Sequence, residues 1–442
     1  MISIRLFSSP LLVVLTVLLL SPGETPCHAQ LFDRATVLEQ VLVPRPNGTV
    51  SEPLTIVIRR GRITEMSADA DAPMMSRKVD AKGLYATAGL FDPASTLTLG
   101  AVSSASAVHS AWDGFDRYDS DAIRAAIASG VTRIQLQPSG PAGIVGRVST
   151  ISLAPLDGGG HGVLEKEAVA LCIDLNQGTP LARIRTFEKV RTAFRTAQRG
   201  REGIEDYSTE LEEYLEALAE AAKESGEKDK KKDDEKKDDE KKDGEKKDDG
   251  PAKPDRPDRN PAGDVLIQVL EQQLPVRILA RRSEDILNAV DLATEFQFPF
   301  QLQGADEAHM VLGSLKELEG LSVLLDRPQR SLDRGAAPRT SSQLIPLLEE
   351  AGIPWTVGSG GPSSGLWRTV RAISGQAGKA SPLSLVNAGP DRGSAAWLRR
   401  GTSHLVLWEG NPALDGSARP NRVIIDGTVV WQRPAGTQEG SF

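Results

Sequence analysis

The residues most often used in hydrolytic catalysis are sparse in this chain. Only five histidines occur among its 442 residues. His28 falls in an N-terminal segment that we expect to be removed, His161 lies in a glycine loop, His309 lies in a helical pattern and His404 lies in a late β-rich segment. We therefore expect these last three, and His109, to be surface or internally satisfied histidines rather than metal ligands.

Two further patterns resemble catalytic loops but lack the partners that such loops need. Ser359 lies in the glycine-rich loop 358–361, yet no base can be identified for it, and we expect no nucleophile elbow. A second loop lacks the Gly-Lys-Ser/Thr of a phosphate-binding loop and predicts a plain turn. Its glycines are Gly140, Gly143 and Gly146.

Strand and helix patterns alternate through the second half of the chain. An alternation of this kind is typical of a parallel sheet closed as a barrel. A helix over 121–130 followed by a strand adds a similar unit earlier in the chain. The later strands are expected at Leu274–Ala280, Phe298–Gln303, Gly320–Leu325 and Ile353–Gly358, with helices from Ser283, Glu307 and Ser341.

Both ends of the chain are β-rich. Short strands with Gly turns are expected before Val79, and again over 404–410 and 422–431. Between the first group and the barrel, residues 79–96 indicate a strand, a turn at Gly83 and a second, buried strand that begins near Gly89.

Residues 79–96 resemble the segment that opens the barrel of the amidohydrolase superfamily. Residues 58–63 resemble the phrase that precedes that barrel, and 404–412 with 422–431 resemble its closing strands. The resemblance implies an α/β fold: a TIM-type (β/α)8 barrel, partly degenerate, with a small β-sandwich formed by the N- and C-terminal segments. The implied boundaries are 30–83 plus 401–434 for the sandwich and 84–400 for the barrel.

The same resemblance assigns positions to metal ligands. The family holds zinc or a similar ion with two histidines on strand one, a Lys or Glu on strand four, one histidine on each of strands five and six, and an Asp on strand eight. Strand four cannot be placed from the sequence. The other positions hold no ligand of the expected kind: they are Ala94, Thr96, Leu279, Gln303 and Gly360. In place of the metal, Asp92 is expected to form a structural ion pair with Arg281 or Arg282.

These positions favour an amidohydrolase-like protein without metal-dependent hydrolase activity, that is, a pseudoenzyme that binds a small molecule or a partner. No catalytic, cofactor-binding or metal-binding residue is assigned, and no cofactor is expected. One alternative is an active hydrolase of carbon–nitrogen bonds other than peptide bonds, such as those of cyclic amides, with zinc or a similar divalent ion. A second is an envelope structural or interaction protein.

Residues 1–29 have the pattern of a signal peptide. Arg5 precedes an apolar run from Leu11 to Leu20, and small residues lead to a cut after Ala29. The run is too short for a stable membrane span. We therefore expect export to the periplasm or the extracellular space, which would leave Cys172 as a lone, buried thiol.

A helix and a charged insertion interrupt the barrel. Residues 187–222 predict a helix whose apolar face packs on the barrel. That face comprises Ile204, Tyr207, Leu211, Leu215 and Leu218. Residues 226–262 are a Lys/Asp/Glu-rich, low-complexity insertion that we expect to be disordered, and which would be the contact of the envelope protein. The net charge of −8 disfavours a nucleic-acid partner.

Overall fold

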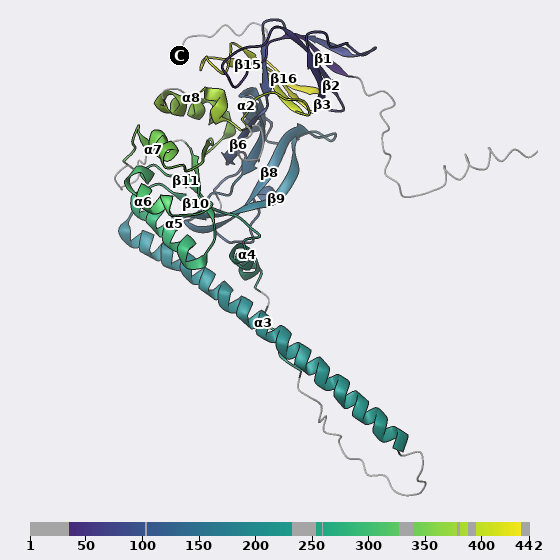
Figure 1. Ribbon diagram of the computed structural model, residues 1–442, viewed down its shortest axis with the longest axis vertical. Coiled ribbons are helices and arrows are strands. Elements are labelled where there is room, and N and C mark those ends of the chain that lie inside the picture. The colour runs from purple at the N-terminus through teal and green to yellow at the C-terminus, as the bar shows by residue number, and fades with distance from the viewer. Residues whose placement is uncertain are drawn as a thin grey trace, which may run out of the picture.

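The computed structural model describes residues 35–101, 104–231, 253–258, 260–326, 339–377, 381–387 and 395–434. Only the backbone course is described for residues 221–231. The expected signal peptide and most of the charged insertion lie outside these residues. Figure 1 shows a β-sandwich at one end, the barrel and its helices below it, and a long helix that projects from the other end.

The sandwich is built from both ends of the chain. One sheet has the order β3-β2-β1-β4 and the other β16-β15-β14-β5. Their facing side chains form one buried cluster that includes Leu38, Ile56, Leu405 and Ile424. The strands are β1 (Thr36–Val41), β2 (Leu54–Arg59), β3 (Arg62–Ser67), β4 (Arg77–Asp80), β5 (Tyr85–Ala88), β14 (His404–Glu409), β15 (Arg419–Ile425) and β16 (Thr428–Gln432).

The barrel is a sheet of eight strands in the order β13-β12-β11-β10-β9-β8-β7-β6. A parallel bridge between Ser95 and Gly361 brings the first strand to the segment after the last, so the sheet nearly closes. The strands are β6 (Leu90–Ser95), β7 (Val131–Leu136), β8 (Gly143–Pro155), β9 (His161–Asp174), β10 (Val276–Ala280), β11 (Phe300–Gly304), β12 (Ser322–Leu325) and β13 (Trp355–Val357). The expected barrel with its β-sandwich is therefore confirmed.

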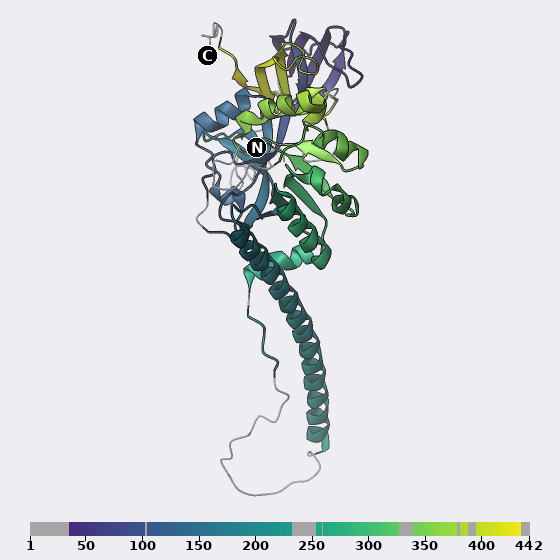
Figure 2. The same ribbon diagram turned by 90° about the vertical axis from the view of Figure 1, so that its left-hand side faces the viewer.

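Helices cover the outside of the barrel (Figure 2). Side chains alternate along β10, so Val276 and Ile278 join the apolar core that the helices complete, while Arg277 points inward. The helices are α2 (Ser120–Ala128), α3 (Pro180–Lys231), α4 (Pro261–Leu270), α5 (Ser283–Phe296), α6 (Leu312–Lys316), α7 (Leu344–Glu350) and α8 (Leu366–Ala377), with short 3₁₀ turns η1 (Ala111–Gly114), η2 (Ala308–Met310), η3 (Ser363–Gly365) and η4 (Pro382–Leu385).

The third strand departs from a regular barrel. β8 runs antiparallel to both β7 and β9, whereas the other neighbouring pairs are parallel. A tight glycine turn over residues 156–160 joins β8 to β9 as a hairpin, so no crossover helix is needed between them. This hairpin is the degenerate part of the barrel.

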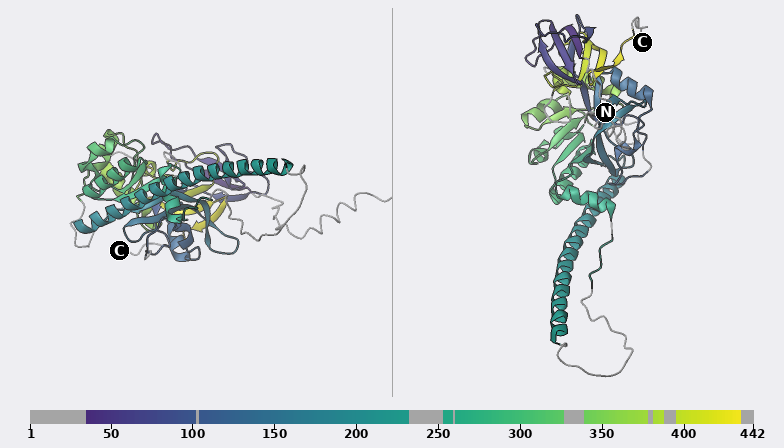
Figure 3. Two further views of the ribbon diagram at one scale, coloured as in Figure 1. Left: turned by 90° about the horizontal axis from the view of Figure 1, so that it is seen from below. Right: turned by 90° about the vertical axis from the view of Figure 1, so that its right-hand side faces the viewer.

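Helix α3 differs from its expected role. It begins earlier, at Pro180, and continues to Lys231, six residues into the charged segment that we expected to be disordered. Its first half packs on the body through Val190, Phe194 and Ala197. Its second half projects (Figures 1 and 3), and Ile204, Leu215 and Leu218 are exposed instead of packed on the barrel. The spacing of the apolar residues identifies an apolar face of the helix, but it does not show which part of the protein covers that face.

Candidate functional site at the carboxyl ends of the barrel strands

The carboxyl ends of the parallel strands form one rim, which is where barrels of this kind carry their active sites. On the first strand, β6, Ala94 is fully buried. Thr96 follows the strand, and its backbone N–H donates to the carbonyl oxygen of Gly361 at 2.9 Å. Neither position presents an imidazole to the rim.

The strand register identifies the fourth strand, which the sequence alone did not. In β9 and β10 Asp174 pairs with Leu279, and in β10 and β11 Leu279 pairs with Gln303. Asp174 therefore lies level with the fifth- and sixth-strand ligand positions. Burial raises its pKa to about 6, although it accepts hydrogen bonds from the backbone and side-chain N–H groups of Asn176. It is a carboxylate at the position where the family often has Lys or Glu.

A buried arginine occupies the middle of the rim. Arg281, just after β10, donates to Asp326 at 2.8 Å and to Asp306 at 3.3 Å. All three side chains are buried. Burial alone would lower the pKa of Arg281, but the two carboxylates outweigh it and raise that pKa. The side-chain amide of Gln303 donates to the other oxygen of Asp326 at 3.0 Å.

Asp306 has an unusual protonation equilibrium. Burial raises its pKa to about 6, in spite of the neighbouring Arg281, and the charge of Asp326 adds to the increase. The cation of the rim is thus a guanidinium held between two carboxylates. The expected ion pair of Asp92 with Arg281 or Arg282 is therefore wrong, because Arg281 pairs with two other carboxylates and Asp92 is held by serine donors.

Gly360 leaves no room for the strand-eight aspartate. Its φ is +63°, a conformation that side chains rarely adopt, and a Cβ there would lie 2.8–2.9 Å from atoms of Asp326. Asp326 follows β12, the seventh strand, so a carboxylate from the neighbouring strand fills this space. The packing of the rim therefore disfavours an aspartate at position 360.

Asp92 is held by hydroxyl and amide donors. Its carboxylate accepts from the backbone N–H of Ser359 at 2.9 Å, the hydroxyl of Ser359 at 2.6 Å and the hydroxyl of Ser363 at 2.7 Å. Burial raises its pKa, and these hydrogen bonds partly oppose the rise. The network ties β6 to the loop after β13.

One pattern at this rim was not predicted from the sequence. Residues 361–365 match Gly-x-Ser-x-Gly and precede α8, with Ser363 in the central position. The Ser363 side chain is fully buried, and its hydroxyl contacts Asp92 and, at 2.6 Å, the hydroxyl of Ser95. A nucleophile elbow needs an exposed hydroxyl beside a base. The environment of Ser363 is structural instead.

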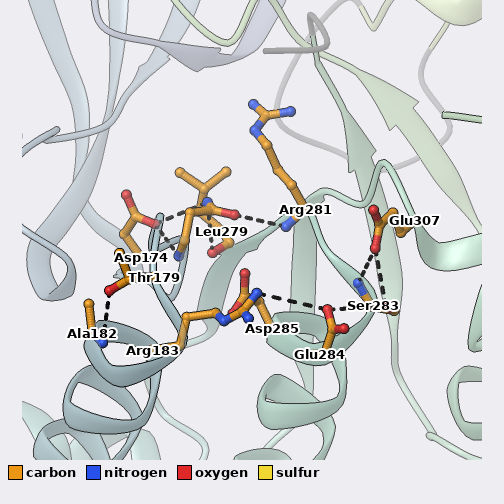
Figure 4. A network of polar contacts seen from close by, with 11 residues as sticks. Asp174, Thr179, Ala182, Arg183, Leu279, Arg281, Ser283, Glu284, Asp285 and Glu307 are labelled. Atoms are coloured by element: carbon orange, nitrogen blue, oxygen red, sulfur yellow. Dashed lines mark hydrogen bonds and ion pairs between the residues drawn. The ribbon is translucent and has the colours of Figure 1, made fainter. Parts of the chain in front are cut away.

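A second polar cluster lies outside the rim, where α3 and α5 begin (Figure 4). Both carboxylate oxygens of Asp285 are buried and lack a hydrogen-bond partner in the described part of the chain, and Arg183 Nε lies 3.8 Å from one of them. Burial raises the pKa of Asp285 to about 7. The Arg281 side chain points away from this pair. Nearby, Glu307 accepts from the backbone N–H of Ser283 at 2.8 Å.

The histidines lie elsewhere. His404 begins β14 in the sandwich, and burial lowers its pKa to about 3. His161 begins β9, and His309 lies in η2. Within the described ranges, no group of three or more His, Cys, Asp or Glu side chains is placed to hold a metal ion.

A zinc-type ion does not fit the residues at the rim. Such ions need imidazole, thiolate or carboxylate donors that converge on one point. Of the family's positions, Asp174 alone carries a suitable donor, and the carboxylates of Asp306 and Asp326 are already engaged by Arg281.

Comparison with known proteins supports the fold. The structure is similar to an amidohydrolase from Thermotoga maritima, with 18% sequence identity and a TM-score of 0.64 over 90% of this chain and 100% of that one. The described chain therefore has the fold of that amidohydrolase.

More distant similarities include an N-isopropylammelide isopropylaminohydrolase from Burkholderia multivorans (16% identity, TM-score 0.44, 90% and 98% covered) and a beta-aspartyl dipeptidase from Fervidobacterium islandicum (10%, 0.46, 91% and 97%). No protein-family model and no curated protein matches the sequence. Among the described helices, none is sufficiently long and apolar to cross a membrane.

Proposed function

We propose that this chain is an amidohydrolase-like pseudoenzyme, which has exchanged metal-dependent hydrolysis for the binding of a small molecule or a partner. The observation that carries the proposal is Arg281, whose guanidinium supplies the positive charge between Asp306 and Asp326. A fixed guanidinium has no exchangeable coordination site, so it cannot activate a water molecule as a bound metal ion does.

The neighbouring residues support the same proposal. Gln303 donates to Asp326, and Gly360 leaves room for it. The hydroxyls of Ser359 and Ser363 are directed to Asp92. The amide nitrogen of Gln303 and the two serine hydroxyls are thus engaged in structural contacts. We retain export as part of the proposal, on the pattern of residues 1–29.

The second candidate is an active hydrolase of carbon–nitrogen bonds. It is favoured by the fold shared with the Thermotoga maritima amidohydrolase and by Asp174, a carboxylate with a pKa of about 6 at the fourth-strand position. A group of that pKa can exchange a proton near neutral pH.

Metal content separates the two candidates. The mature chain from residue 30 would be expressed without a histidine tag, supplied with zinc and manganese, and analysed by elemental mass spectrometry, with a known zinc amidohydrolase prepared in parallel. We expect near-zero metal in a folded sample. One or two tightly held ions per chain, together with turnover of a cyclic amide, a dipeptide or an imidazolone, would overturn the proposal.

A further inference from the structure

A cavity of about 880 Å³ lies at the end of the barrel opposite the rim. Its lining includes Val276, Ser322 and Trp355, which are the first residues of β10, β12 and β13. The amino ends of parallel strands normally serve stability rather than function. A cavity of this size at that end is large enough for a small organic ligand.

Arg277 forms the inner end of the cavity. It is 3% exposed and points into the barrel from β10. Its guanidinium donates to the side-chain oxygens of Gln135, Gln137 and Gln301, and to the backbone carbonyl oxygen of Pro93. These contacts join β6, β7, β10 and β11 across the interior.

The chemistry of arginine fixes the orientation of the two amides that line the cavity. A guanidinium only donates hydrogen bonds, so the oxygens of Gln135 and Gln301 must face Arg277. Their NH₂ groups are then directed away from it. The NH₂ group of Gln301 has Ser322 Oγ at 3.5 Å, a weak contact.

Thr150 adds a hydroxyl to the same surface. Its side chain is 2% exposed and lines the cavity, and its Oγ1 has no hydrogen-bond partner in the described residues. A buried hydroxyl without a partner is costly unless something else satisfies it. The inner surface of the cavity is thus rich in N–H and O–H donors above a buried cation.

The walls are apolar. Val169, Val323 and Trp355 line them. Two acidic side chains also line the cavity: Glu165 is engaged by Arg133 Nε at 2.7 Å, and Glu349 lies at an exposed position of α7. An apolar wall with a few convergent donors is the usual composition of a site for an organic ligand.

We propose that this cavity binds a small organic monocarboxylate. The carboxylate would accept hydrogen bonds from Thr150 and from the amides of Gln135 and Gln301, in the field of Arg277, and the apolar part of the ligand would lie against Trp355 and Val169. The site lies apart from the rim, so this proposal does not depend on whether the chain binds a metal ion there.

Three probes of one shape test the ligand class. Phenylacetate, phenylacetamide and phenethylamine would each be titrated calorimetrically into the mature full chain. We expect saturable binding of phenylacetate, binding of phenylacetamide weaker by about tenfold, and no binding of phenethylamine. No saturable binding of phenylacetate up to about 10 mM, or equal binding of phenethylamine, would overturn the proposal.

Variants locate the site. Val169→Trp fills the cavity and should weaken phenylacetate binding by at least about tenfold, whereas Val163→Trp changes an exposed residue of the same strand and should have no effect. Thr150→Val should weaken binding by about fivefold. Its control is Ser152→Ala, which removes another buried hydroxyl of β8 that does not line the cavity.

Circular dichroism would check that each variant folds. Should Val169→Trp fail to fold, phenylacetate binding by Thr150→Val and by Ser152→Ala is compared instead, and a loss confined to Thr150→Val supports the site. Unchanged binding in the folded cavity variants, or equal losses in the controls, would refute the site.

Discussion

Arg281→Met is the most direct test of the internal ion pairs. The substitution keeps an apolar stem of similar length but removes the positive charge between Asp306 and Asp326. Arg281 is 6% exposed and its partners are 5% and 4% exposed, so solvent screens these contacts little. Removal of one partner from a buried pair typically costs about 3–5 kcal/mol. We expect a loss of about 4 kcal/mol in the free energy of unfolding at pH 8.

The loss should depend on pH. Asp306 has a native pKa of about 6, above its value of 3.8 in the unfolded chain, so the native state retains this proton between those values. The stabilisation that comes from this tightly bound proton of Asp306 is present below pH 4 and is lost as the pH rises through 6. Without Arg281 its native pKa would rise further. We therefore expect the loss to shrink to about 2 kcal/mol at pH 5.

Urea unfolding followed by tryptophan fluorescence measures the loss in the free energy of unfolding at pH 5 and at pH 8. Arg185→Met, at an exposed position of α3, is the matched control and should change stability by less than about 0.5 kcal/mol. Adding Asp326→Asn to Arg281→Met should recover at least about 1.5 kcal/mol, because one uncompensated carboxylate is then neutral. A loss below about 1 kcal/mol at pH 8, or the same loss at both pH values, would refute the reasoning.

Three other substitutions test neighbouring parts of the structure. Gly360→Asp, which would restore the expected ligand type, should destabilise the chain by at least about 2 kcal/mol in urea unfolding, because φ is +63° and the new Cβ would meet Asp326. Asp285→Asn should raise stability by about 2 kcal/mol at pH 8 and have little effect at pH 5, since the native pKa of Asp285 is about 7; equal effects at both pH values would contradict this. Ser359→Ala should cost about 1.5–3 kcal/mol at pH 7 by removing a hydroxyl donor from Asp92, and a neutral result would show that this hydrogen bond adds nothing.

The frame of the fold was predictable because local rules specify it. Asp119 accepts a hydrogen bond from the backbone N–H of Ala122 at the start of α2, and Gly130 adopts a φ of +91° beyond its end. The strand that follows, β7, places Val131, Ile134 and Leu136 in the core. Signals of this kind lie within a few residues of one another, so the sequence reveals them.

The site was less predictable because it depends on contacts between distant residues. Asp174 became the fourth-strand residue only when the strands were paired, since register is set by neighbouring strands rather than by the sequence of one. Arg281 and Asp326 lie 45 residues apart and meet only in the barrel. Ser363 is different, because its Gly-x-Ser-x-Gly signal was visible and was overlooked.

The residues at and around the family's ligand positions depend on one another. The position of Asp326 requires glycine at 360, because any side chain at 360 would collide with Asp326. Asp326 also accepts hydrogen bonds from Arg281 and Gln303. Arg281 in turn lies over Gly304, whose φ is +91° and whose missing Cβ would come within 2.9 Å of the arginine side chain. Restoring a single ligand would therefore break a contact without creating a site. A metal site built on the family's positions would require the exchange of this whole set together, because the structural role of each residue is defined by the others.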